Sequence, residues 1–62
     1  MRQFIRADFL RDMGFREVGR GRFQKVHRGI VTAEIVIRDS GEIVSTFGVP
    51  MAPNGYVYLY LR

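Results

Sequence analysis

The apolar residues of this chain change their spacing at Gly14, and that change limits the folds open to it. Before Gly14, Ile5, Phe9 and Met13 recur every four residues, as on one face of an amphipathic helix. After Gly14, β-branched and aromatic residues alternate with polar ones, and Gly, Pro, Asn and Asp separate the runs. The pattern predicts an α+β fold, in which one N-terminal helix packs on an antiparallel meander of four to five strands.

The helix is expected over residues 1–13. Gly14 ends it, because glycine readily adopts the left-handed conformation found after a helix C-terminus. An alternative begins the helix at Phe9, with Asp8 as its N-cap and residues 1–7 extended. The longer helix is preferred, and the shorter one stays open.

Five runs after the helix have the alternation of strands, and short turns rich in Gly, Asp and Asn separate most of them. The expected strands are Phe15–Val18, Arg22–His27, Ile30–Arg38, Glu42–Gly48 and Tyr56–Leu61. A single helix covers only one face of such a sheet, so the other face is either solvated or used for binding.

Strand alternation also predicts which side chains enter the core. The residues of the third strand that share one face are Val31, Ala33, Ile35 and Ile37. In the fourth strand, Ile43 and Phe47 are expected to join the core.

Length and composition exclude several classes of function. A chain of 62 residues is expected to form one domain, residues 1–62. It has no Cys and a single histidine, His27, so we expect no disulfide, no metal site and no cofactor. No apolar run reaches the roughly 20 residues that cross a bilayer, and no signal-peptide pattern is present. These features predict a cytoplasmic protein without membrane contact.

The charge of the chain is concentrated in its first half. The net charge is +4, and residues 1–28 carry eight cations against three anions. The candidate nucleic-acid-binding residues lie in one Arg/Gly-rich hairpin, residues 16–28: Arg16, Arg20, Arg22, Lys25, His27 and Arg28. Arginine pairs with phosphates and guanine edges, and a two-stranded ribbon fits the DNA major groove. Phe15 and Phe23 either stack on bases or belong to the core, and an ordinary solvated hairpin is the alternative.

No group of residues resembles a catalytic site. General acid–base chemistry needs titratable groups that converge on one pocket, whereas His27 stands alone and the six carboxylates are spread along the chain. The leading hypothesis is therefore a small, basic, non-enzymatic module that binds nucleic acid, with no catalytic residue.

A second hypothesis rests on the last expected strand, in which Tyr56, Tyr58 and Tyr60 share one face. Tyrosine is common in protein interfaces. The stripe is consistent with a homodimer, with a stacking platform for nucleic acid, or with a protein-binding accessory or inhibitor of the phage or mobile-element type. In the last case the tyrosine strand or an edge strand would contact a protein, such as one with an acidic surface. The alternative is a second small cluster, in which Val36 and Val44 pack with the tyrosines.

The order of helix, Gly14-Phe15, basic strand, turn and strand over residues 4–38 resembles the start of the HicA-type toxins. That resemblance implies a double-stranded-RNA-binding-like fold and RNA cleavage. The family carries its histidine after a Gly-Ser pair on the second strand, where this chain reads Gly21-Arg22-Phe23, and it closes with a helix that is not expected here. No catalytic residue is carried over, and an RNA-cleaving enzyme that uses His27 is a distant alternative.

Overall fold

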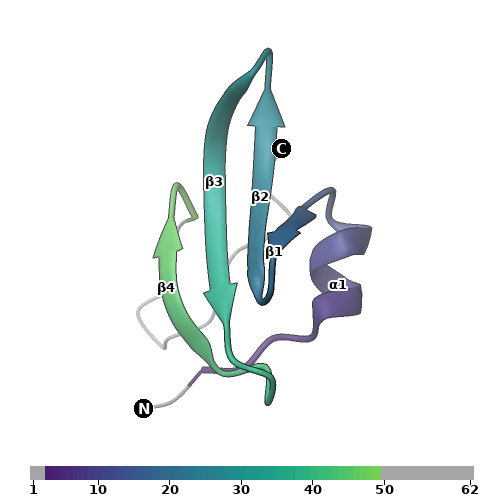
Figure 1. The fold of residues 1–62 in the computed structure, drawn as a ribbon, viewed down its shortest axis with the longest axis vertical. Helices are drawn as coiled ribbons and strands as arrows, with labels where there is room; N and C mark the ends of the chain where they lie inside the picture. Colours follow the sequence, from purple (N-terminus) through teal and green to yellow (C-terminus); the bar gives the residue numbers. More distant parts are fainter. Residues whose placement is uncertain (1–2, 50–62) are drawn as a thin grey trace.

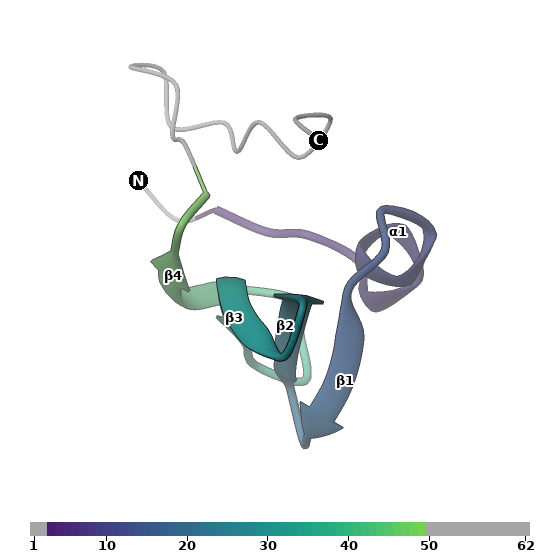
Figure 2. The same ribbon diagram turned by 90° about the horizontal axis from the view of Figure 1, so that it is seen from above.

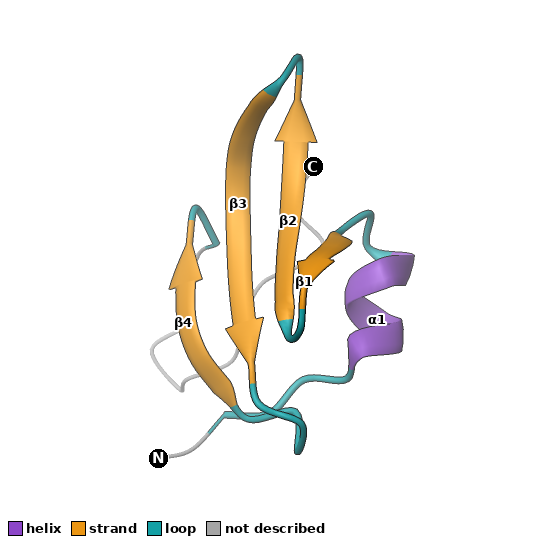
Figure 3. Ribbon diagram, in the orientation of Figure 1, coloured by secondary structure: helices purple, strands orange, loops and turns teal. Residues whose placement is uncertain are grey.

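The computed structural model describes residues 3–49, which form a short helix and a four-stranded antiparallel sheet. The elements are α1 (Ala7–Asp12), β1 (Arg16–Gly19), β2 (Arg22–His27), β3 (Ile30–Ile37) and β4 (Ile43–Phe47) (Figures 1 and 3). The strands lie in the sheet in the order β1-β2-β3-β4, as in a meander. The predicted α+β fold is confirmed with four strands, and the expected strand Tyr56–Leu61 lies outside the described residues.

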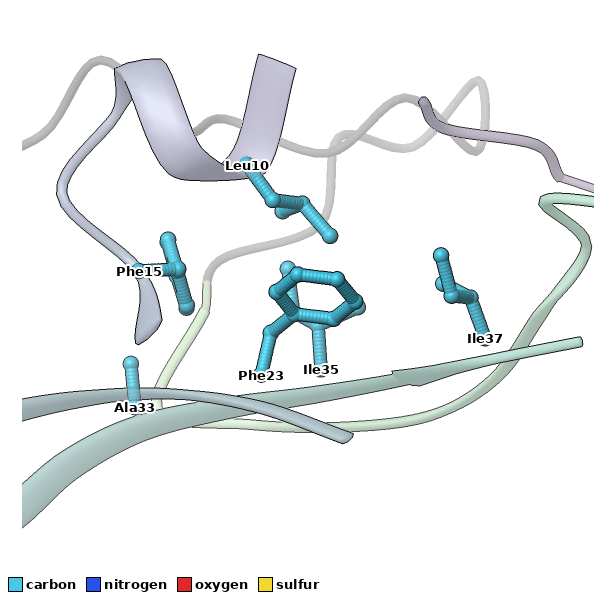
Figure 4. Packing of buried hydrophobic residues seen from close by; sticks show 6 residues of the cluster. All are labelled: Leu10, Phe15, Phe23, Ala33, Ile35 and Ile37. Carbon is cyan, nitrogen blue, oxygen red and sulfur yellow. The ribbon is translucent and has the colours of Figure 1, made fainter. Parts of the chain in front are cut away.

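The core lies between α1 and one face of the sheet (Figure 2). Leu10 of α1 is fully buried and points toward Phe23 of β2 and Ile35 of β3 (Figure 4). The other buried members of the cluster are Phe15, Ala33 and Ile37. Burial of a side chain of this size stabilises a fold by about 1.5–3 kcal/mol, so Leu10 anchors the helix. The sheet face opposite α1 is not covered by a helix within residues 3–49.

Residues 3–6 are extended, so the preferred prediction of a helix over residues 1–13 is wrong. Phe4 forms an antiparallel bridge with Glu42, and the N–H of Ile5 donates to the C=O of Gly41 at 2.9 Å. These long-range bonds satisfy backbone groups that a helix would otherwise pair locally.

The helix begins at Ala7, and Arg6 is its N-cap without a side-chain hydrogen bond. The shorter alternative correctly predicted an extended segment before the helix. It placed the N-cap at Asp8 and the first helical residue at Phe9, two residues after the observed positions. Six residues are too few for a stable isolated helix, so packing through Leu10 determines where α1 forms.

No helix within residues 3–49 is long and apolar enough to cross a bilayer.

A β-bulge interrupts each of the three strand pairs. The extra residues are Val18, Thr32 and Val44. Because Val44 has no residue opposite it, the alternation of β4 shifts by one position. Ile43 packs against the core, as predicted, whereas Phe47 faces away from it and is 60% exposed. The prediction that Phe47 joins the core is therefore wrong.

The bulge at Thr32 has a similar effect on β3. Ala33, Ile35 and Ile37 are buried, as the alternation predicts, but Val31 lies beyond the bulge and is 38% exposed. Alternation thus places core residues correctly only as far as the bulge.

Candidate nucleic-acid interface

The six residues predicted to bind nucleic acid are spread along β2, β1 and the adjoining turns. They are Arg16 on β1, Arg20 in the β1–β2 turn, Arg22, Lys25 and His27 on β2, and Arg28 in the β2–β3 turn. A strand rises about 3.3 Å per residue, so Arg22 and Arg28 lie roughly 20 Å apart. The expected single cluster is divided between two ends of the sheet.

At the end of β2 next to the β1–β2 turn, both arginines have carboxylate partners. Arg20 donates two hydrogen bonds to Asp39, one of them from Nε to Oδ1 at 3.2 Å. The pKa of Arg20 is raised because Asp39 accepts these hydrogen bonds and carries the opposite charge. Nε of Arg22 lies 3.5 Å from Oε2 of Glu34, and the same oxygen accepts a hydrogen bond from Gln24 at 2.7 Å. Carboxylates therefore offset the positive charge at this end.

The cations that have no carboxylate partner lie toward the other end of β2, near the β2–β3 turn. Within residues 3–49, the Lys and Arg side chains in ion pairs with carboxylates are Arg6, Arg11, Arg20, Arg22 and Arg38. Arg16, Lys25 and Arg28 form no ion pair in this part of the chain. Nζ of Lys25 lies 5.5 Å from the centroid of the Phe15 ring instead. We call these three residues, together with the exposed His27, the basic end.

Residues 26–31 project beyond the rest of the sheet as a two-stranded ribbon, which we call the β2–β3 ribbon. At its base, Ala33 is buried in the core and Gly48 lies beside Thr32. The pairing of β2 with β1 stops at Gln24, and that of β3 with β4 stops at Glu34. No other strand therefore flanks this segment within the described residues, and Figure 1 shows the hairpin extending past both neighbouring strands. Its exposed aliphatic residues are Val26 (47%), Ile30 (67%) and Val31 (38%).

Arg28 occupies an unusual backbone position at the tip of this ribbon. His27 pairs with Ile30, so Arg28 and Gly29 form a two-residue turn with φ of 53° and 78°. Positive φ at both central positions is typical of a type I′ turn, which favours Asn-Gly. The left-handed conformation costs most other residues about 1 kcal/mol, and among residues 3–49 Arg28 is the only non-glycine residue that adopts a positive φ. A strained position of this kind is a reason to suspect a functional side chain.

The aromatic residues of the predicted hairpin are not available for stacking on bases. Phe15 and Phe23 are 5% and 1% exposed and belong to the core, which confirms the alternative considered for them. The residues predicted for a protein interface, Tyr56, Tyr58 and Tyr60, lie outside the described part of the chain, and that role stays a prediction.

A surface depression beside α1 was not predicted from the sequence. It has a volume of about 420 Å³ and is lined by Phe4, Ile5, Arg6, Asp8, Phe9, Asp12 and Ser40. No sequence signal could have revealed it, because it forms only when the N-terminal segment pairs with the β3–β4 connection.

Across residues 3–49, no three His, Cys, Asp or Glu side chains gather as metal ligands.

Comparison of the chain with protein-family models, curated proteins and solved structures gives no match. Function is therefore inferred from the charge distribution and the shape of the β2–β3 ribbon.

Proposed function

We propose that this protein is a small non-enzymatic module that binds nucleic acid through the basic end. The observation that carries the proposal is the position of Arg16, Lys25 and Arg28, the Lys and Arg side chains of residues 3–49 that have no carboxylate partner. Arg16 pairs with Gln24, the neighbour of Lys25, and Arg28 lies three residues beyond Lys25, so all three lie toward the same end of β2. Such a cation can neutralise a phosphate without first leaving an ion pair. Arg20 and Arg22, which were predicted for the same role, are expected to contribute less, because Asp39 and Glu34 compete for them.

The surroundings of His27 also favour binding over proton transfer. Its side chain is exposed at the end of β2, and it makes no ion pair or hydrogen bond within residues 3–49. A general base needs neighbouring groups that orient it toward the substrate. The proposal therefore gives His27 a role in binding and no role in RNA cleavage.

The test is binding of fluorescent DNA and RNA oligonucleotides of about 20 nucleotides, single- and double-stranded, measured by anisotropy between roughly 50 and 200 mM salt. If Arg16, Lys25 and Arg28 each neutralise one phosphate, the logarithm of the binding constant should fall with the logarithm of salt concentration. The expected slope is about −2 to −3.

A matched pair of variants shows whether the basic end is responsible. Arg28→Gln and Arg20→Gln each remove one positive charge from a turn at one end of β2. We expect Arg28→Gln to weaken binding several-fold and Arg20→Gln to have a smaller effect. No binding of any oligonucleotide at low salt would rule out the proposal, as would equal losses in the two variants.

A second candidate function, a protein-binding accessory or inhibitor, is favoured by a different observation. Phe4 and Phe9 are 59% and 47% exposed in the depression beside α1. Among residues 3–49, β1 also ends the strand order, so a strand of a partner could add to its outer edge. A partner protein that survives nuclease treatment, loses binding in Phe9→Ser and keeps it in Arg28→Gln would support this candidate.

A further inference from the structure

We infer that the nucleic acid bound by the basic end is duplex DNA, and that the β2–β3 ribbon enters its major groove. Arg28 would then lie at the base edges and Arg16 and Lys25 at the phosphates, so two cations instead of three set the salt slope, which is expected to be about −2. This inference rests on the proposed function, to which it adds the class of nucleic acid and the role of each cation.

The length of the ribbon fits the major groove of B-form DNA. Gln24 is the last residue of β2 that pairs with β1, and Arg28 lies four residues further along the chain. Four residues of strand span about 13 Å, whereas the groove is about 8.5 Å deep and about 12 Å wide and admits a two-stranded ribbon. On the other side, Gly48 lies beside Thr32, three residues from Gly29, which leaves about 10 Å of ribbon. The tip can therefore reach base edges before the neighbouring segments meet the DNA backbone. The major groove of A-form RNA is deep and narrow, so the ribbon is not expected to enter it.

The chemistry of the tip also matches the major groove. A guanidinium can donate two hydrogen bonds to O6 and N7 of guanine, and aliphatic side chains can contact the thymine methyl group. Arg28 supplies the guanidinium at the turn, and the exposed Ile30 and Val26 supply aliphatic surface next to it. Since Arg28 forms no ion pair within the described residues, its donors are free for a base.

Single strands suit this surface less well. Proteins that bind them commonly stack bases on exposed aromatic rings, but Phe15 and Phe23 are buried. The exposed phenylalanines among residues 3–49 are Phe4, Phe9 and Phe47. The first two line the depression beside α1, and Phe47 lies on β4 opposite Glu34, so none of these rings belongs to the β2–β3 ribbon.

The two other cations lie behind the tip, where the groove would open. Lys25 is three residues before Arg28, and Arg16 pairs with Gln24. Both are therefore about 10–13 Å from the tip along the ribbon, a distance that suits contact with phosphates on the rim of the groove. Phosphate contacts affect all sequences equally, whereas a base contact discriminates between them.

The experiment compares the full-length protein on four probes of one mixed sequence: duplex DNA, duplex RNA and each single DNA strand. We expect the protein to bind duplex DNA at least about fivefold more tightly than the other probes, because one good base contact contributes about 1 kcal/mol or more. The major-groove dye methyl green should compete with the protein, and a minor-groove dye should not.

Two variants separate base contacts from phosphate contacts. Lys25→Gln should weaken binding to every DNA sequence alike and reduce the salt slope by about 1. Replacing thymine by uracil in the duplex removes the methyl groups and should weaken binding of the unmodified protein. Ile30→Ser should bind both duplexes with the same affinity, because it lacks the side chain that contacts the methyl group.

The outcomes distinguish this inference from the proposed function. If no probe binds, the proposed function fails, and this inference fails with it. If RNA or single strands bind as tightly as duplex DNA, and Arg28→Gln weakens that binding, the proposed function stands and the major-groove inference is wrong. Competition by the minor-groove dye alone would also overturn it.

Discussion

Arg28 and Gly21 both have a positive φ, but the structure restricts the choice of residue much more strongly at Gly21 than at Arg28. At Gly21, with a φ of 71°, an added Cβ would lie 2.2 Å from the carbonyl oxygen of Ile37, so only glycine fits. At Arg28 the backbone also requires a positive φ, but the side chain is exposed at the tip of the ribbon. Asn or Gly would suit this turn position better. Stability therefore does not explain the arginine at this position, whereas the proposed binding role of its side chain would.

We expect Arg28→Asn to raise the free energy of unfolding by about 0.5–1 kcal/mol, because asparagine tolerates the left-handed conformation. Urea denaturation measures the change. Arg20→Asn is the control, since Arg20 does not have a positive φ, and it should not be stabilised. If the turn arginine serves binding, the stabilised variant should also bind oligonucleotides more weakly. A loss of stability in Arg28→Asn would contradict this account of the turn.

Among the elements, α1 depends most on a single contact. It has six residues, and Leu10 is its one fully buried side chain. Arg11 adds a polar link to the sheet, because its guanidinium lies 3.0 Å from Glu17 of β1 and 5.7 Å from the centroid of the Phe23 ring. Exposed ion pairs contribute at most about 1 kcal/mol, so the apolar contact dominates the docking of the helix.

Leu10→Ala should lower the free energy of unfolding by about 2–5 kcal/mol, because it removes buried methyl groups and leaves a cavity. Phe9→Ala is the matched control on the same helix. Phe9 is 47% exposed, so its loss should cost under about 1 kcal/mol. Urea midpoints measure both changes, and similar losses in the two variants would show that the helix is not held mainly by Leu10.

At the scale of the whole molecule, the described core is small. Six buried apolar residues form it, and a chain of this length buries only about 60% of its unfolded surface. The stability of such a protein is modest, so a ligand that binds only the folded state should raise its melting temperature measurably.

Duplex DNA at about 100 times its Kd should stabilise the protein by about 2.7 kcal/mol, which corresponds to roughly 10–20 °C in Tm for a domain of this size. Differential scanning fluorimetry in low salt measures the shift. A variant with Arg16→Gln, Lys25→Gln and Arg28→Gln should show little or no shift. A shift of the same size in this triple variant would place the binding site outside the basic end.

Several features of the fold follow from local patterns and were predicted. The change of spacing at Gly14 predicted one helix followed by an antiparallel meander, and β2 has the predicted bounds, Arg22–His27. Phe23 lies in the core, which was one of the two alternatives considered for it, and a turn at Arg28-Gly29 joins the expected strands Arg22–His27 and Ile30–Arg38. Periodicity and turn preference act over a few neighbouring residues, so they can be interpreted without knowing the rest of the fold.

The remaining features depend on contacts between distant segments. Val44 has no partner in β3, and this bulge turns Phe47 away from the core. Pairing of Phe4 with Glu42 keeps residues 3–6 out of the helix. The division of the cations has the same origin, because sheet register and the chain path after β3 brought Glu34 and Asp39 next to Arg22 and Arg20. Register is decided by the packing of whole strands against one another. For that reason the sequence could show which half of the chain is basic, but only the folded structure could show which of its cations remain unpaired.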